Sequence, residues 1–200
     1  MLAEAARLAG GGGVARAASG LAGPAGRSGR DRLVEGVPGL GERGGQKGGE
    51  KVGKNPTDRG KQGSKRHLVS DRRGVPLAVV LTAANVHDSK AFEELVDAIE
   101  PIKRPGRGRP RKRPEKLHAD KGYDFPRCRK ALRERGIKAR IARRGKDTSE
   151  RLGRHRWVVE RTLAWLARYR RLSVRYERRA DIHEAFLHLG CSLICLNYLS

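Results

Sequence analysis

Hydrophobic and polar positions divide the chain into two unlike parts. Residues 1–47 show no hydrophobic periodicity, and the first fifty residues hold 15 of the 26 glycines. Glycine at this density costs too much backbone entropy for stable helix or sheet, so we expect a disordered Gly/Ala/Arg-rich arm over 1–47. Patterned sequence follows, and we expect one folded domain over 48–200.

Within the patterned part, short apolar runs alternate with helical stripes. Runs at 67–69 and 75–81 flank a turn at 71–74, which predicts a β-hairpin with Gly74 at positive φ. Further strands are expected at 117–119 and 137–141, and helices at 91–99, 127–135, 156–172 and 182–199. The last helix has Asp181 as its expected N-cap, with Glu184 three residues on. Strands and helices in this order predict an α/β fold.

Charge narrows the class of partner. The formal net charge is +23 and the pI is near 11.1, a field that attracts polyanions, with nucleic acid as the natural partner. A basic DNA enzyme and a ribosomal or chromatin type of binding protein share this composition. No apolar run approaches the roughly 20 residues that span a bilayer, so no membrane partner is expected. The three cysteines form no CxxC pair, which favours reduced thiols in a cytoplasm.

Two acidic residues stand where metal-dependent chemistry would need them. Asp120 ends a short apolar strand, a position that points into the ligand crevice of α/β sheets. Glu160 lies forty residues later in a helix. Two-metal phosphoryl transfer needs carboxylates brought together from separate elements. Taken singly, each residue is more often a solvated or salt-bridged side chain.

Four sequence blocks change that balance. They are Asn-Pro-Thr-Asp-Arg-Gly-Lys at 55–61, Ala-Asn-Val-His-Asp-Ser at 84–89, Asp-Lys-Gly-Tyr-Asp at 120–124 and Arg-Trp-Val-Val-Glu-Arg-Thr at 156–162. In order and spacing they resemble the IS4/IS5-like DDE transposases, over about residues 48–196. A single block would be weak, whereas four in order are specific.

The resemblance implies an RNase H-like mixed sheet flanked by helices, with three acids that bind Mg²⁺ or Mn²⁺. Asp120 matches the second acid and Glu160 the third, and Arg156 matches the arginine that accompanies the glutamate. The implied function is that of an insertion-sequence transposase, which binds transposon-end DNA and catalyses metal-dependent strand cleavage and transfer. Double-stranded DNA is the implied partner. A homodimer or larger assembly on DNA, in a bacterial cytoplasm at the nucleoid, would accompany it.

The family's first acid has no match. Its expected neighbourhood, residues 37–42, contains no Asp and no strand pattern. Asp31 and Glu35 lie too far upstream, Glu42 lies too near, and Asp71 is expected to be a turn residue. We therefore expect the sheet to lack its first strand, and we hypothesise that residues 1–47 are an out-of-frame segment. The alternative function is a catalytically dead remnant that acts only as a basic DNA-binding protein.

Basic residues near the two acids are expected to contact DNA. The loop at 103–116 has eight basic residues; it resembles a minor-groove-binding hook, although a surface loop that touches phosphates is the favoured interpretation. The Arg-rich stretch 151–179 would hold the substrate backbone, with Trp157 and Trp165 in packing roles. The expected DNA-binding residues are Lys121, Arg107, Arg109, Arg111, Lys112, Arg161 and Arg168. His188, Cys191 and Cys195 share a helix face, but core packing is favoured there over metal binding.

Overall fold

The computed structural model describes residues 31–37, 48–56, 58–102, 109–110, 112–145 and 149–198, with the backbone alone over 31–37 and 149–156. The strands are β1 (Asp31–Val37), β2 (Gly53–Lys54), β3 (Gln62–Asp71), β4 (Pro76–Ala83), β5 (Lys116–Ala119) and β6 (Lys138–Ile141). The helices are α3 (Phe92–Asp97), α4 (Pro126–Glu134), α5 (Ser149–Arg168), α6 (Arg170–Ser173) and α7 (Ala180–Leu196), with short 3₁₀ turns η2 (Asp88–Lys90) and η3 (Lys121–Tyr123). The expected α/β class is confirmed.

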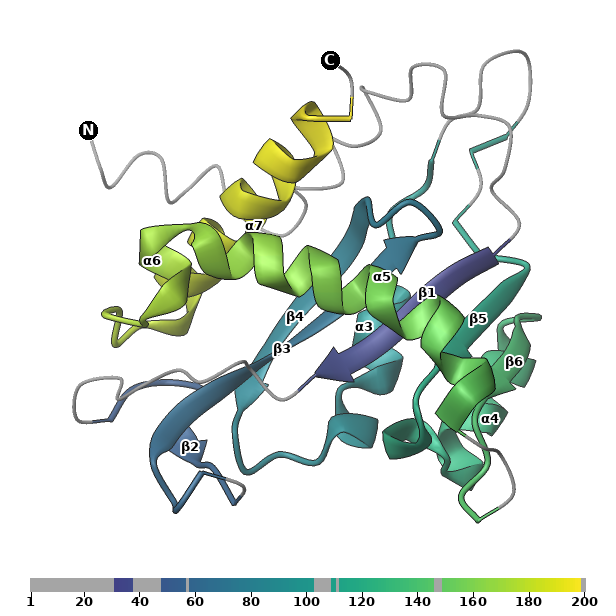
Figure 1. The fold of residues 1–200 in the computed structure, drawn as a ribbon, viewed down its shortest axis with the longest axis horizontal. Coiled ribbons are helices and arrows are strands. Elements are labelled where there is room, and N and C mark those ends of the chain that lie inside the picture. The colour runs from purple at the N-terminus through teal and green to yellow at the C-terminus, as the bar shows by residue number, and fades with distance from the viewer. Residues whose placement is uncertain are drawn as a thin grey trace.

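The sheet is mixed, and β1 lies at its centre (Figure 1). On one side β1 pairs antiparallel with β3, which pairs antiparallel with β4 and, at its start, with β2. On the other side β1 pairs parallel with β5, and β5 parallel with β6. The expectation that the sheet lacks a strand ahead of residue 48 is therefore wrong. Residues 31–37 of the expected arm form the central strand, and its other residues, 1–30 and 38–47, lie outside the described residues.

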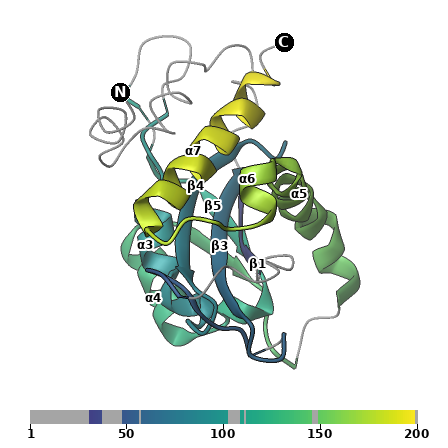
Figure 2. The same cartoon turned by 90° about the vertical axis from the view of Figure 1, so that its left-hand side faces the viewer.

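Two hydrophobic clusters cover the two faces of the sheet, because alternate residues of a strand point to opposite sides. Val69 and Leu117 contribute to the cluster beneath α3 and α4. Leu68 and Leu81 contribute to the cluster beneath α5 and α7. Figure 2 shows α5 on one side of the strands and α3 and α4 on the other. The described chain is thus a three-layer structure.

The β3–β4 hairpin forms as predicted. Gly74 has φ of 90°, and the Asp71 carboxylate accepts hydrogen bonds from the backbone N–H groups of Arg73 (2.8 Å) and Val75 (2.9 Å). Asp71 is therefore a turn residue, as expected. Thr162 of α5 donates to the Gly74 carbonyl at 2.9 Å, which ties the turn to the helix above it.

Two helix predictions need correction. The helix expected over 156–172 breaks at Tyr169, whose ψ of 120° is extended, so α5 and α6 are separate. Asp181 is not the N-cap of α7; Arg179 occupies that position without a side-chain hydrogen bond. The Glu50 carboxylate instead accepts from the Ala180 N–H at 3.0 Å. A distant residue supplies the cap, which no local pattern could reveal.

Candidate active site

Asp120 lies where β5 gives way to η3. Leu117 and Ala119 are buried between the sheet and α4, and the chain then turns at Asp120, whose side chain accepts a hydrogen bond from the Lys121 N–H. This bond makes Asp120 the N-cap of η3. Its side chain is half-buried, so it combines a fixed position with access to solvent.

The η3 turn rests on a layer of polar contacts. An ideal Cβ built on Gly122 would lie 3.7 Å from the Asp88 carboxylate, which forms a 2.9 Å ion pair with Lys65. The Tyr123 hydroxyl lies 3.5 Å from His67 Nδ1, and His67 Nε2 lies 2.8 Å from the Thr82 hydroxyl. Burial lowers the pKa of His67 to about 4, so the ring is neutral near pH 7. Asp88, which belongs to the sequence block at 84–89, therefore lies next to Gly122 in the turn that follows Asp120.

Glu160 lies on α5, the helix that crosses the central strand (Figure 1). Val158, Val159 and Leu163 are buried against the sheet and α7, whereas Glu160 is exposed. Arg156 lies one turn before Glu160 on α5, in the part of the helix of which the backbone alone is described. Asp120 and Glu160 thus come from the two elements next to β1: the parallel strand beside it and the helix over it.

The backbone register of β1 adds a third acidic position. Glu35 is the partner of Leu68 in the antiparallel pairing with β3. The parallel pairing with β5 ends at Leu33 and His118, two residues before Glu35 and two before Asp120. Glu35 is therefore level with Asp120 along the sheet. Sequence spacing alone had excluded this residue.

The described side chains do not by themselves form a complete metal site. Among them, no three His, Cys, Asp or Glu residues converge closely enough to hold a metal ion. For His188, Cys191 and Cys195 core packing was expected in preference to metal binding, and both cysteines are buried. Burial raises the pKa of Cys195 to about 11, as suits an inert core thiol.

The expected DNA-contacting residues fall into three groups. Arg107 and Arg111 lie outside the described residues, whereas Arg109 and Lys112 are described and exposed. Lys121 is half-buried in η3, and Arg168 is exposed at the end of α5. Arg161 is half-buried, and its guanidinium donates to the Arg73 carbonyl at 2.6 Å and lies over two tryptophan rings.

Comparison with known proteins agrees with this geometry. The family model described as "Transposase DDE domain" matches residues 34–197, so the chain belongs to the DDE transposases, a family of enzymes. The match begins inside β1, upstream of the boundary expected at residue 48. No helix within the described ranges is long and apolar enough to cross a membrane.

One relative is the transposase of a particular insertion sequence element. The chain is 52% identical over 199 residues to a protein of Burkholderia cepacia named as a transposase for insertion sequence element IS402. The alignment covers all of this chain and 94% of that protein. It therefore runs through the Gly/Ala/Arg-rich arm as well. The expectation of an insertion-sequence transposase is confirmed.

Proposed function

We propose that this transposase cleaves DNA at the ends of its insertion sequence and joins the freed 3′ end to target DNA, with Asp120 and Glu160 as carboxylate ligands of Mg²⁺ or Mn²⁺. The observation that carries the proposal is the placement of both acids next to the central strand, one at the end of β5 and one on α5. The mixed sheet, antiparallel on one side of β1 and parallel on the other, supports the RNase H-like fold that the family implies.

The donor set suits a hard divalent cation. Mg²⁺ prefers oxygen ligands and is commonly held by one or two carboxylates together with substrate phosphates and water. When bound, such ions activate the attacking oxygen and stabilise the leaving oxygen of a phosphodiester. The protein's own contribution is to hold the Asp120 and Glu160 carboxylates, and Arg156, one turn before Glu160, would orient the glutamate or bind the scissile phosphate.

Glu35 is the residue that we propose as the third carboxylate. Its register, level with Asp120 on the adjacent parallel strand, is the support for this assignment. Glutamate in place of aspartate changes the reach of the carboxylate by one methylene and keeps its ligand chemistry.

DNA is held in this proposal by the basic residues around the acids. Lys121, beside Asp120, would contact the phosphate backbone, with Arg109 and Lys112 in the preceding loop and Arg168 farther along α5. A net charge of +23 supports binding through counterion release. We assign the protein to the cytoplasm, on the nucleoid.

The test is strand cleavage of a labelled transposon-end duplex with Mg²⁺ or Mn²⁺. D120N, E160Q and E35Q should each abolish cleavage while DNA binding is retained, because each keeps its shape and loses a charged ligand. E134Q is the matched control, since Glu134 is an exposed helical glutamate on α4. Mn²⁺ binding by calorimetry gives a second measurement that does not depend on turnover. Cleavage that persists in D120N and E160Q would contradict the proposal.

A second candidate is a non-catalytic DNA-binding remnant, because the family's first acid has no aspartate match in this sequence. It predicts salt-sensitive DNA binding without cleavage by the wild-type chain. Little preference for the element's ends over other DNA would accompany it.

We further propose a homodimer on DNA that pairs through α7. Leu189, Leu193 and Leu196 are 55%, 39% and 48% exposed and recur at helical spacing. Helix α7 carries Asp181 and Glu184 but no Lys or Arg. The whole chain has a charge of +23, so most of its surface would repel a second copy. The leucine face of α7 has no basic residue and would not add to this repulsion, so we propose that it binds a second copy. L189D should give a monomer by sedimentation, and an unchanged oligomeric state would refute the pairing.

A further inference from the structure

Asp88 carries a carboxylate next to the candidate active site that the proposed reaction does not use. It begins η2, and its Oδ1 accepts a hydrogen bond from Lys65 Nζ, on β3, at 2.9 Å. The same ammonium donates to the Val86 carbonyl at 3.0 Å. The side chains of Lys65 and Asp88 are only 12% and 18% exposed, so the two charges pair away from most of the solvent.

An ion pair that is largely withdrawn from water is weak evidence for stability. Its attraction often only offsets the free energy of removing both charges from water, and apolar side chains of similar size can stabilise a fold as well. The Lys65–Asp88 pair is also electrically neutral, so it adds little to the field that attracts DNA. Its contacts therefore point to a role in geometry.

The pair borders the η3 turn, which begins directly after Asp120. An ideal Cβ on Gly122 would lie 3.7 Å from Asp88 Oδ2, an ordinary van der Waals distance. Tyr123 is fully buried, and its hydroxyl lies 3.5 Å from His67 Nδ1. Lys65 and His67 are two residues apart on β3 and therefore point to the same face of the sheet. Side chains from one face of β3 thus support the middle and the end of the turn.

The position of the turn determines the position of the Asp120 carboxylate. Asp120 is the N-cap of η3, and its carboxylate accepts a hydrogen bond from the Lys121 N–H. A shift of the turn would therefore carry the carboxylate with it. Groups that orient a metal ligand from outside the coordination shell affect metal affinity or activity by about 10- to 100-fold.

We propose that the Lys65–Asp88 ion pair positions Asp120: it holds the η3 turn through Gly122 and so fixes the orientation in which the Asp120 carboxylate binds the divalent ion. This inference rests on the proposed function, because it needs Asp120 as a ligand. It makes Lys65 and Asp88 positioning residues, which contact neither the ion nor the DNA.

The test compares full-length variants in complex with the transposon-end duplex. D88A removes the carboxylate, and D88N keeps an oxygen that can accept from Lys65. We expect the Mn²⁺ affinity measured by calorimetry to fall about 10- to 100-fold in D88A and less in D88N. D97N is the matched control, because Asp97 also forms an ion pair, with Arg135 at 2.7 Å, where α3 lies next to the end of α4.

Two further measurements distinguish positioning from a general structural role. In D88A the kcat of strand cleavage should fall together with the Mn²⁺ affinity, whereas the KM for DNA should stay unchanged, because a neutral pair contributes little to DNA binding. K65M removes the cation of the pair and should also lower the Mn²⁺ affinity. The double variant K65M/D88A should lose no more than D88A alone, since the two residues act as one unit.

The outcomes separate this inference from the proposed function. Wild-type Mn²⁺ affinity and kcat in D88A, or equal losses in D88A and D97N, would overturn the positioning role and leave the proposed function standing. A higher KM for DNA at unchanged Mn²⁺ affinity would also overturn it. If D88A does not fold, K65M decides between the same results. If the wild-type complex neither binds Mn²⁺ nor cleaves DNA, the proposed function fails, and the positioning role fails with it.

Discussion

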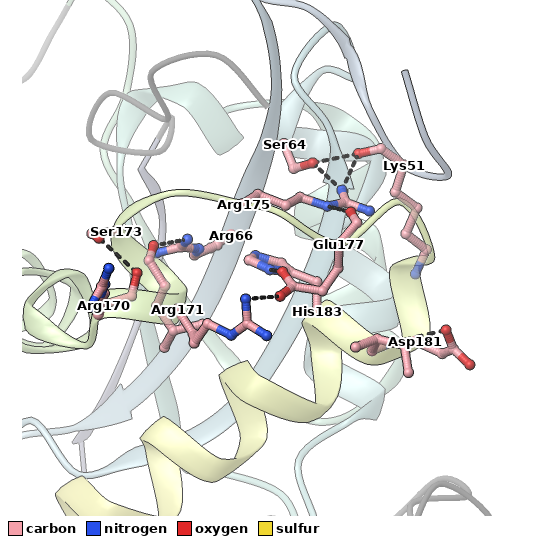
Figure 3. A network of polar contacts seen from close by, with 12 residues as sticks. Lys51, Ser64, Arg66, Arg170, Arg171, Ser173, Arg175, Glu177, Asp181 and His183 are labelled. Carbon is pink, nitrogen blue, oxygen red and sulfur yellow. Dashed lines mark hydrogen bonds and ion pairs between the residues drawn. The ribbon is translucent and has the colours of Figure 1, made fainter. Parts of the chain in front are cut away.

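Substitution of Arg175 tests the contact that joins Glu50, Lys51 and Ser64 to the segment between α6 and α7. Arg175 is 3% exposed, and its Nε donates to the Glu177 carbonyl at 2.9 Å. Its Nη2 donates to the Glu50 carbonyl at 2.7 Å, and its Nη1 to the Ser64 hydroxyl at 2.5 Å and the Lys51 carbonyl at 3.3 Å. Figure 3 shows this cluster next to the Glu177–His183 pair, whose ring nitrogen and carboxylate oxygen lie 3.2 Å apart.

The R175M variant keeps an unbranched side chain, although a shorter one, and removes all four bonds. Hydrogen bonds from charged donors contribute about 1.5–3 kcal/mol each. The bond to Ser64 is fully buried, whereas water can replace part of the other three. We therefore expect the free energy of unfolding to fall by about 2–4 kcal/mol. R175K should lie between, since a lysine ammonium cannot reproduce the planar fork.

The assay is urea denaturation at pH 7, followed by circular dichroism, with the slope of free energy against urea unchanged. R178A is the control: Arg178 is exposed, and it holds the Glu50 N–H through its backbone carbonyl at 3.0 Å, which alanine retains. A loss below about 1 kcal/mol in R175M, or an equal loss in R178A, would refute the reasoning.

Three further predictions follow from the same structure. K121A should weaken duplex binding at low salt and reduce the slope of log affinity against log salt by about one unit, as titrations at several salt concentrations would show; an unchanged slope would mean that Lys121 makes no phosphate contact. Burial, opposed by Asp88 and assisted by Lys65, lowers the pKa of His67 from 6.5 to about 4, so the unfolded chain binds this proton first as pH falls. The free energy of unfolding that depends on neutral His67 is fully present above pH 6.5. As the pH falls from 6.5 to 4, roughly 3 kcal/mol of it is lost. The H67Q variant should not show this loss when unfolding is measured across the same pH range. The three buried thiols should react with Ellman's reagent only as the chain unfolds, and fast reaction of the native protein would contradict their burial; they are Cys128, Cys191 and Cys195.

Local patterns in the sequence predicted the elements that depend on local chemistry. The turn at Gly74, the strand before Asp120 and α4 before Gly136 each follow from a short run and its terminating residue. The family resemblance supplied Asp120 and Glu160, which spacing alone would have left as ordinary surface acids.

Features that depend on distant contacts could not be predicted. Glu50 caps α7 from the other end of the domain, and the α5–α6 break at Tyr169 brings α6 under α7. There Gly190 allows close approach, because an added Cβ would lie 2.9 Å from a Leu172 methyl group. The central strand was missed because Asp31–Val37 carries charged residues and a glycine, and its pairing with β3 and β5 is made by backbone hydrogen bonds that need no apolar pattern.

The hypothesis that residues 1–47 are out of frame competes with the assignment of Glu35 on β1 as the third carboxylate, and the encoding DNA distinguishes the two. The out-of-frame hypothesis predicts a strand ending in Asp, ahead of residue 48, in one of the other two reading frames. The Burkholderia cepacia relative aligns with the whole chain, including residues 1–47. The other two reading frames of its gene should therefore be searched for the same strand.

The central position of β1 has a consequence for how the protein is made. Its antiparallel partner β3 leaves the ribosome soon after it, but its parallel partner β5 follows only after β4 and α3. Until then, a nascent chain exposes one open edge of β1, and non-local parallel pairing of this kind forms slowly. The yield of folded protein therefore depends on how often that edge pairs with β5 before it pairs with another chain.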